Sequence, residues 1–237
     1  MSLGLGLNSN KDNEPWTPAH LPGLIHWYRK GIGITSDGDE VGGAILGDVS
    51  VWRDEWGVNH FEGDPDSNSH NAAPNLTSSN TILFNHSANV LSFAAELTLG
   101  EFAVYVKLNF DASATVATED LFEKDSNNFL KLTGPTAGRV RIQGERHDFT
   151  IAEIVEGTPF VLGYERATNG DIMIYKDNVA GSASDGDDLN VAISTTLGIT
   201  QIGKPATDAE WYELVISNTV LTAGQRSDLY QYMSNIK

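Results

Sequence analysis

The chain has 237 residues, of which 40% are hydrophobic and 9% aromatic, which is enough for one large core and too much for a disordered chain. It carries 32 acidic and 15 basic residues, a formal charge of -17. This balance excludes a surface built for nucleic-acid phosphates and disfavours binding to anionic membranes. The sequence has no cysteine, so neither disulfides nor thiolate metal sites contribute.

The first segment, residues 1–20, is rich in Gly, Asn and Ser and shows no hydrophobic period. This composition predicts a flexible arm that docks on a second copy or on another protein. Residues 21–237 are expected to form one domain, because all-β domains often reach this size alone. The chain shows neither a basic region followed by an apolar run at its start nor an apolar stretch of membrane-spanning length, so we expect no signal peptide and no transmembrane segment.

The clearest predicted strand is EFAVYVKLNF at 101–110, where apolar and mixed positions alternate strictly. Such alternation predicts a half-buried strand, with Phe102 and every second residue after it facing the core. Shorter signals of the same kind recur at about ten-residue spacing, separated by turns such as Asn169-Gly170 and Asp177-Asn178. They lie at 81–84, 120–123, 129–133, 139–143, 160–165, 171–176, 200–203 and 210–217. The pattern predicts an all-β, two-sheet antiparallel sandwich of the jelly-roll type.

One short helix is predicted at the C-terminus. Thr222 and Gln225 form a capping box, and Leu229, Met233 and Ile236 follow at helical spacing. We expect this helix to pack against the edge of the sandwich. Among the tryptophans, those at 27, 52 and 211 lie in strand-like segments and are expected in the core.

Three segments, in order, resemble a known family. Residues 17–28, TPAHLPGLIHWY, are similar to the "iPGL-x-x-W" opening of concanavalin-A-like domains in phage and bacterial surface proteins. Residues 49–60, VSVWRDEWGVNH, resemble the "v-x-x-W-x-D-x-S-G-x-g-x-h" element of that group, with Glu55-Trp56 in place of a small polar pair. Residues 210–226, EWYELVISNTVLTAGQR, resemble its closing strand and helix.

The resemblance covers residues 17–237 and is to the concanavalin-A-like lectin/glucanase, or laminin-G-like, jelly-roll domains found in phage virion structural proteins. It implies that the opening and closing strands lie side by side. It also implies a place on the virion, as a tail, fibre or capsid-decoration component that contacts other virion proteins and host-surface glycans.

The sequence offers no recognisable catalytic constellation. Glucanases of this fold carry a Glu-x-Asp-x-(x)-Glu run on one strand face, and the chain has none; Glu213 falls out of register with Asp208 and Glu210. The six histidines show no close metal-ligand spacing, and no Gly-x-Ser-x-Gly elbow is present. We therefore expect a protein that is not an enzyme.

Two kinds of binding site are suggested by loop composition. Carboxylates beside Gly in loops are hard oxygen ligands of the kind that Ca²⁺ prefers, with turn chemistry as the alternative explanation. The candidate metal residues are Asp37, Asp39, Asp185, Asp187 and Asp188. An aromatic platform beside polar side chains is typical of sugar sites, with coverage of the core as the alternative role for its tryptophan. The candidate carbohydrate-binding residues are Trp56, His60, Asp64, Asp66, Asn68 and His70.

Three functional hypotheses follow from these observations. The first is a phage virion protein with a lectin-like domain, which associates with itself or with other virion proteins through the arm. The second is a calcium-assisted carbohydrate-binding module of a bacterial surface protein. The third, more remote, is a glycoside hydrolase.

Overall fold

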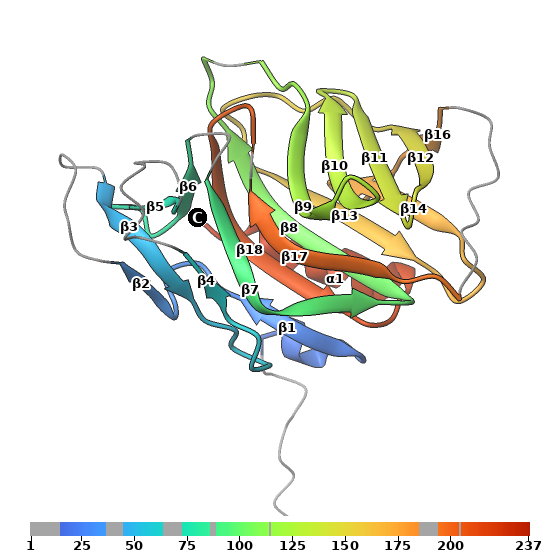
Figure 1. The fold of residues 1–237 in the computed structure, drawn as a ribbon, viewed down its shortest axis with the longest axis horizontal. Coiled ribbons are helices and arrows are strands. Elements are labelled where there is room, and N and C mark those ends of the chain that lie inside the picture. Colours follow the sequence, from blue (N-terminus) through green and yellow to red (C-terminus); the bar gives the residue numbers. More distant parts are fainter. Residues whose placement is uncertain are drawn as a thin grey trace, which may run out of the picture.

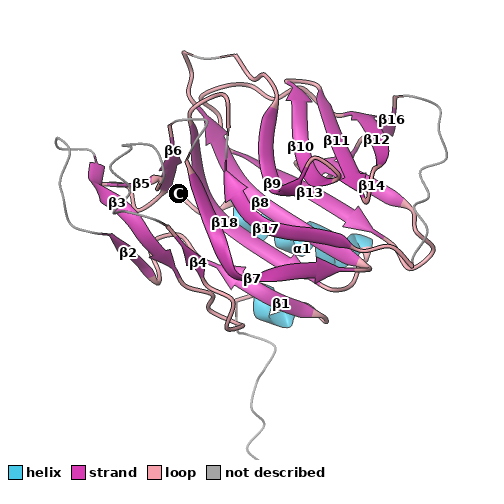
Figure 2. Ribbon diagram, viewed as in Figure 1, coloured by secondary structure: helices cyan, strands magenta, loops and turns pink. Residues whose placement is uncertain are grey.

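The computed structural model describes residues 15–36, 45–63, 73–85, 89–113, 115–184, 194–203 and 205–237. The fold is the predicted antiparallel β-sandwich with a single C-terminal helix, α1 (Ala223–Ser234), and a short 3-10 helix, η2 (Pro18–His20). Figure 2 shows how strands dominate the molecule. Within the described ranges, no helix is long and apolar enough to cross a membrane.

The sheet that contains the closing strand is called sheet A here. Its first strands, in spatial order, are β15 (Val179–Ala180), β14 (Ile172–Lys176), β13 (Phe160–Arg166), β8 (Phe102–Phe110) and β18 (Ala209–Ser217). On its other side, β18 pairs with β1 (Leu24–Tyr28) near its end and with β6 (Ile82–Phe84) near its start. From β6 the sheet continues through β5 (Asn75–Thr77) to the first part of β3 (Ile45–Trp52). The opening strand β1 therefore pairs with the closing strand β18, as the resemblance implies.

The second sheet, sheet B, faces sheet A across the core. Its strands, in spatial order, are β16 (Ser182–Ala183), β12 (Glu145–Thr150), β11 (Ala137–Ile142), β10 (Asn128–Gly134), β9 (Glu119–Asp125), β17 (Leu197–Gly203), β7 (Val90–Leu99), β4 (Phe61–Glu62), the second part of β3 and β2 (Ile34–Ser36). Strand β3 thus contributes to both sheets. In Figure 1, β9–β12 lie in front of β13 and β14.

The core between the sheets is built from alternate residues of each strand. Val104, Val106 and Leu162 from sheet A belong to one buried cluster with Phe122 and Leu130 from sheet B. Trp52 and Trp211 are fully or almost fully buried in this core, as expected from their strand positions. Trp27 is also buried, at 7% exposed, but in a separate apolar cluster with α1. The predicted strands all have counterparts in the structure, displaced by no more than a few residues at either end.

Strand β8 is buried on both faces, which corrects the prediction of a half-buried strand. Its second face carries Ala103 and Tyr105, which pack with Leu229 and Met233 of α1 in a separate apolar cluster. The helix therefore covers the outer face of sheet A, not the edge of the sandwich, and Figure 1 shows it behind the strands. Thr222 caps it as predicted, with its side chain accepting from the Gln225 amide.

Two charged groups on the covered face hold α1 in place. Glu165 of β13 accepts hydrogen bonds from Arg226 (Nη2 to Oε2, 3.0 Å) and from the Tyr105 hydroxyl (2.7 Å). Lys107 of β8 is buried, and its Nζ donates to the carbonyls of Met233 (2.9 Å) and Ser234 (3.1 Å). The last carbonyls of a helix have no intrahelical partner, and α1 has no basic residue in its last turn. Lys107 adds donors to those of the Asn235 and Ile236 amides and supplies the positive charge.

We expect Lys107→Met to weaken the attachment of α1, because Met keeps much of the apolar stem but removes the donors to the helix carbonyls. The free energy of unfolding should fall by about 1–3 kcal/mol, the cost of leaving buried polar groups unpaired. Urea unfolding measures it. Lys124→Met is the control, since Lys124 makes an exposed ion pair with Glu96. Equal effects of the two substitutions would contradict the role given to Lys107.

Candidate functional site

The loop of residues 53–60, between β3 and β4, carries the two predicted sugar-binding residues that the structure describes. These are Trp56 and His60. The other four, Asp64, Asp66, Asn68 and His70, lie outside the described residues. The five proposed calcium ligands, Asp37, Asp39, Asp185, Asp187 and Asp188, also lie outside them. Within the described part of the chain, no group of three or more His, Asp or Glu side chains is placed to hold a metal ion.

The loop is organised around the buried carboxylate of Asp54. Oδ1 accepts from the backbone amides of Trp27 and Trp56, each at 3.0 Å. Oδ2 lies 2.6 Å from Nδ1 of His26. The Asp54 amide in turn donates to Nδ1 of His60 at 3.0 Å. His60, predicted as a sugar ligand, therefore has one ring nitrogen committed to holding the loop.

The loop is also fixed to its neighbours at both sides. The side-chain amide of Asn59 donates to the Ala95 carbonyl of β7 and accepts from the Ala95 amide, both at 2.9 Å. At Gly57 a Cβ atom would lie 2.4 Å from Oδ2 of Asp54 and 2.7 Å from the Ile25 carbonyl oxygen. Only glycine fits there, because real Cβ atoms do not approach other atoms so closely. The turn is therefore held in one conformation.

This rigid loop presents its apolar side chains to solvent. Trp56 is 51% exposed and Val58 is 89% exposed. Coverage of the core, the alternative role for Trp56, does not agree with this exposure. An indole on a fixed backbone loses little freedom when a ligand packs on it, so the geometry suits an aromatic binding platform.

Burial alone would raise the pKa of the Asp54 carboxyl. The hydrogen bond with His26 and those from the backbone amides of Gly57, Trp27 and Trp56 outweigh it, so the pKa lies below its ordinary value. The ionised form is therefore the one that the folded loop requires.

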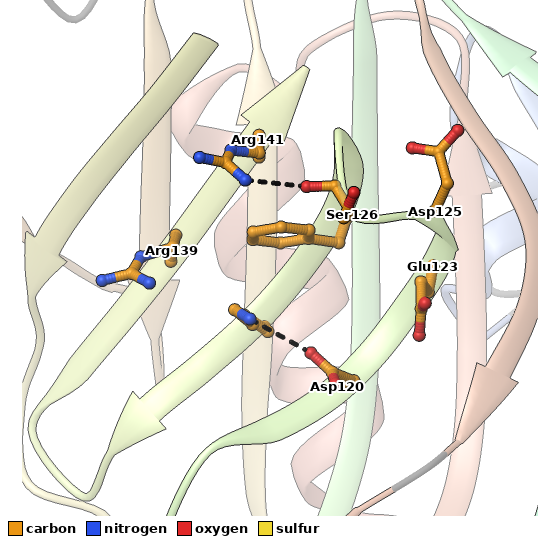
Figure 3. A pocket seen from close by; sticks show the side chains of 8 residues that line it. Asp120, Glu123, Asp125, Ser126, Arg139 and Arg141 are labelled. Atoms are coloured by element: carbon orange, nitrogen blue, oxygen red, sulfur yellow. Dashed lines mark hydrogen bonds and ion pairs between the residues drawn. The ribbon is translucent and has the colours of Figure 1, made fainter. Parts of the chain in front are cut away.

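A second candidate site, not foreseen from the sequence, is a cavity of about 280 Å³ on the outer face of sheet B. It lies across β9, β10 and β11, at the opposite end of Figure 1 from β3 and β4 (Figures 1 and 3). The lining residues are Asp120, Glu123, Asp125, Ser126, Phe129, Lys131, Arg139 and Arg141. The sequence did carry a signal for it: 129 and 131, like 139 and 141, occupy the alternate positions that face away from the core.

The register expected for the β18 carboxylates is wrong in one respect. Glu210 pairs with Asn109 and Glu213 with Lys107, with a bulge between Trp211 and Glu213. The extra residue places Glu210 and Glu213 on the same face of sheet A, although they are three apart in sequence. Glu213 is 2% exposed and accepts from Nε1 of Trp27 at 2.6 Å. Burial raises its pKa, with the bonds from Trp27 and Tyr232 opposing the rise.

No family model matches the sequence, and no curated protein matches it. Several solved structures share its fold. A Trypanosoma rangeli sialidase superposes with a TM-score of 0.61 at 14% identity, over 90% of this chain and 33% of the sialidase. The botulinum neurotoxin serotype D/C binding domain gives a TM-score of 0.53 at 10% identity, over 89% and 52% of the two chains. The botulinum neurotoxin type G receptor binding domain gives 0.52 at 10% identity, over 89% and 51%.

These likenesses agree with the β-sandwich fold and correct one expectation. The sequence was expected to belong to a protein that is not an enzyme, yet the sialidases that share the fold are enzymes, which overturns that exclusion. The chain spans a third of their length, so the likeness covers one part of them. At 14% identity it shows the fold and assigns no activity to this chain.

We expect Asp54→Asn to destabilise the protein by about 1–3 kcal/mol at pH 7, because the amide keeps the shape but loses the charge and one acceptor. The pKa of Asp54 is lowered by folding, so its contribution is present above the unfolded value of 3.8 and is lost as the pH falls through the folded value. The difference between wild type and variant should therefore be constant from pH 7 to about pH 5 and shrink below pH 3.8.

Urea unfolding at pH 7, 5 and 3 measures this difference. Glu55→Gln is the control, since Glu55 is an exposed carboxylate in the same loop. A difference that grows on acidification would contradict the role of Asp54.

Proposed function

We propose that this chain is a carbohydrate-binding β-sandwich domain that contacts its glycan through Trp56 and the loop of residues 53–60. The observation that carries the proposal is a tryptophan, 51% exposed, on a loop whose backbone is fixed by the buried Asp54. The apolar face of a sugar ring packs on such an indole, and the exposed side chains of Arg53 and Glu55 offer polar contacts beside it.

The names of some solved structures with the same fold support a ligand-binding role. One of the Trypanosoma rangeli sialidase structures is a complex with sialic acid, and the botulinum domains are named as binding domains. Calcium support of the sugar site remains part of the proposal, because the acidic loops that suggested it lie outside the described residues. A parallel measurement with calcium and with chelator tests that part.

A place on a virion is the second proposal, and the specific observation in its favour is the resemblance of residues 17–237 to phage surface domains. The pairing of β1 with β18 agrees with that resemblance. If the proposal holds, the protein is present in purified particles of its source in a fixed ratio to the other components. Quantitative mass spectrometry of purified particles measures this, and absence of the protein from them would rule the location out.

We expect Trp56→Ala to weaken glycan binding at least tenfold, about 1.4 kcal/mol, because it removes the stacking surface. The free energy of unfolding should change by less than about 0.5 kcal/mol, since the side chain is exposed. The measurements are a glycan array followed by titration of the best-bound glycan, together with urea unfolding.

Val58→Ala is the matched control, because Val58 is a more exposed apolar residue of the same loop. Undiminished binding by the Trp56 variant would show that the loop is not the sugar site. Equal losses in the two variants would contradict the stacking role given to Trp56.

A further inference from the structure

The outer face of sheet B carries two rows of side chains that run across the strands. In one row, Phe129 of β10 lies between Glu123 of β9 and Arg141 of β11. In the next row, Lys131 of β10 occupies the central position, between Asp120 of β9 and Arg139 of β11. Acidic groups therefore line one side of the cavity and basic groups the other, as Figure 3 shows.

Three of the four cations on β10, β11 and β12 are paired with carboxylates. Lys131 lies 3.4 Å from Asp120, and Arg139 and Arg146 both contact Asp148. These pairs leave little charge for a ligand.

Arg141 differs from its neighbours. Among the described residues its guanidinium makes one hydrogen bond, from Nη1 to the Ser126 carbonyl at 2.8 Å, and no ion pair (Figure 3). Its Nε is buried and has no partner within the same part of the chain. A guanidinium has five N–H donors in a fork that matches a carboxylate, so Arg141 retains capacity for one.

The floor of the cavity is aromatic. The Nζ of Lys131 lies 4.2 Å from the Phe129 ring centroid, and Cζ of Arg141 lies 5.7 Å from it. Both cations thus lie against the phenyl ring, as in other cation–π arrangements. Phe129 is only 6% exposed, so a ligand that enters here meets chiefly the cations that lie over the ring.

The opposite wall, formed by β9, restricts the class of ligand. Asp120, Glu123 and Asp125 repel a bare anion but accept hydrogen bonds from hydroxyl groups. The formal charge of -17 also opposes densely charged polyanions. A neutral sugar satisfies the acidic wall but leaves the guanidinium without a carboxylate.

We propose that this cavity binds a hexuronic acid, that is, a single carboxylated sugar ring of an acidic glycan, with its carboxylate on Arg141 and its hydroxyls toward the β9 carboxylates. The volume of about 280 Å³ lies just below the usual range of small-molecule sites, which suits a ligand of one ring. The site is separate from the Trp56 loop and goes beyond the function proposed for that loop.

The test is titration of the full chain with a panel of the four common hexuronic acids and their neutral parent hexoses, followed by protein NMR. We expect at least one uronic acid to bind at least tenfold more tightly than its parent hexose. Acetate and sulfate are titrated alongside, and both should bind at least tenfold more weakly than that uronic acid. Shifts should be centred on β9–β11.

Arg141→Gln should reduce binding of the uronic acid at least tenfold, whereas Arg146→Gln, the matched loss of one charge on the neighbouring strand, should change it less than twofold. Arg141→Lys keeps the charge and loses the fork, so it should bind with intermediate affinity and serves if the Gln variant does not fold. Trp56→Ala should leave this binding unchanged, which separates the two sites. No binding by any uronic acid, equal binding of a parent hexose or acetate, or an unaffected Arg141 variant would overturn the proposal.

Discussion

The covering of sheet A by α1 is the constraint on which the rest of the structure depends. A sandwich buries one face of each sheet, but here β8, β13 and β18 are buried almost throughout on both faces. The second face therefore has to satisfy whatever charged side chains it carries. Glu165 does so with Arg226, and Lys107 with the last carbonyls of the helix. Buried charges of this kind are tolerated only when they are paired and hydrogen-bonded.

This arrangement limits where the molecule can bind anything. With the outer faces of β1, β8, β13 and β18 occupied, the surfaces left to bind a ligand include the loops at the ends of the strands and the outer face of sheet B. Both candidate sites lie there. The Trp56 loop is an exposed platform with a fixed backbone, and the sheet B site is a hollow lined mostly by strand residues. Residues on strands are held more precisely than residues on loops. In the Trp56 loop, hydrogen bonds to the buried Asp54 fix the backbone and reduce this difference.

Much of the fold could be predicted because alternation is a direct record of which face is buried. Strands β8, β13 and β18 were each found in this way. Strand β7 was not, because the three consecutive exposed residues 94–96, next to a break in its register with β17, interrupt the period. Strand β12 was missed for another reason. Its inward positions are held by His147 and Phe149, and a buried histidine does not read as an apolar residue.

Because hydrophobic alternation reports only on a strand's own faces, the positions of α1 and of Glu213 could not be predicted correctly from it. A period of two shows that a second face is mixed in polarity, but not that a helix far along the chain will cover it. The bulge at Tyr212 shifts Glu213 onto the face of Glu210, and nothing in the local sequence marks that extra residue. The Trp56 loop could be suggested from composition, whereas its rigidity depends on His26 and Trp27, which come from a distant strand.

The outer face of sheet B shows where such prediction stops and why function can be encoded there. The fold requires only that these positions be polar enough for water, so the identity of each side chain is free to serve another purpose. Stability alone would favour an ion pair for every cation on β10, β11 and β12. Lys131, Arg139 and Arg146 each have one. Arg141 keeps a buried Nε without a partner in the described part of the chain, which is unfavourable for a buried donor. A local cost without a local gain is typical of a functional position, and a ligand carboxylate beside Arg141 would supply the gain.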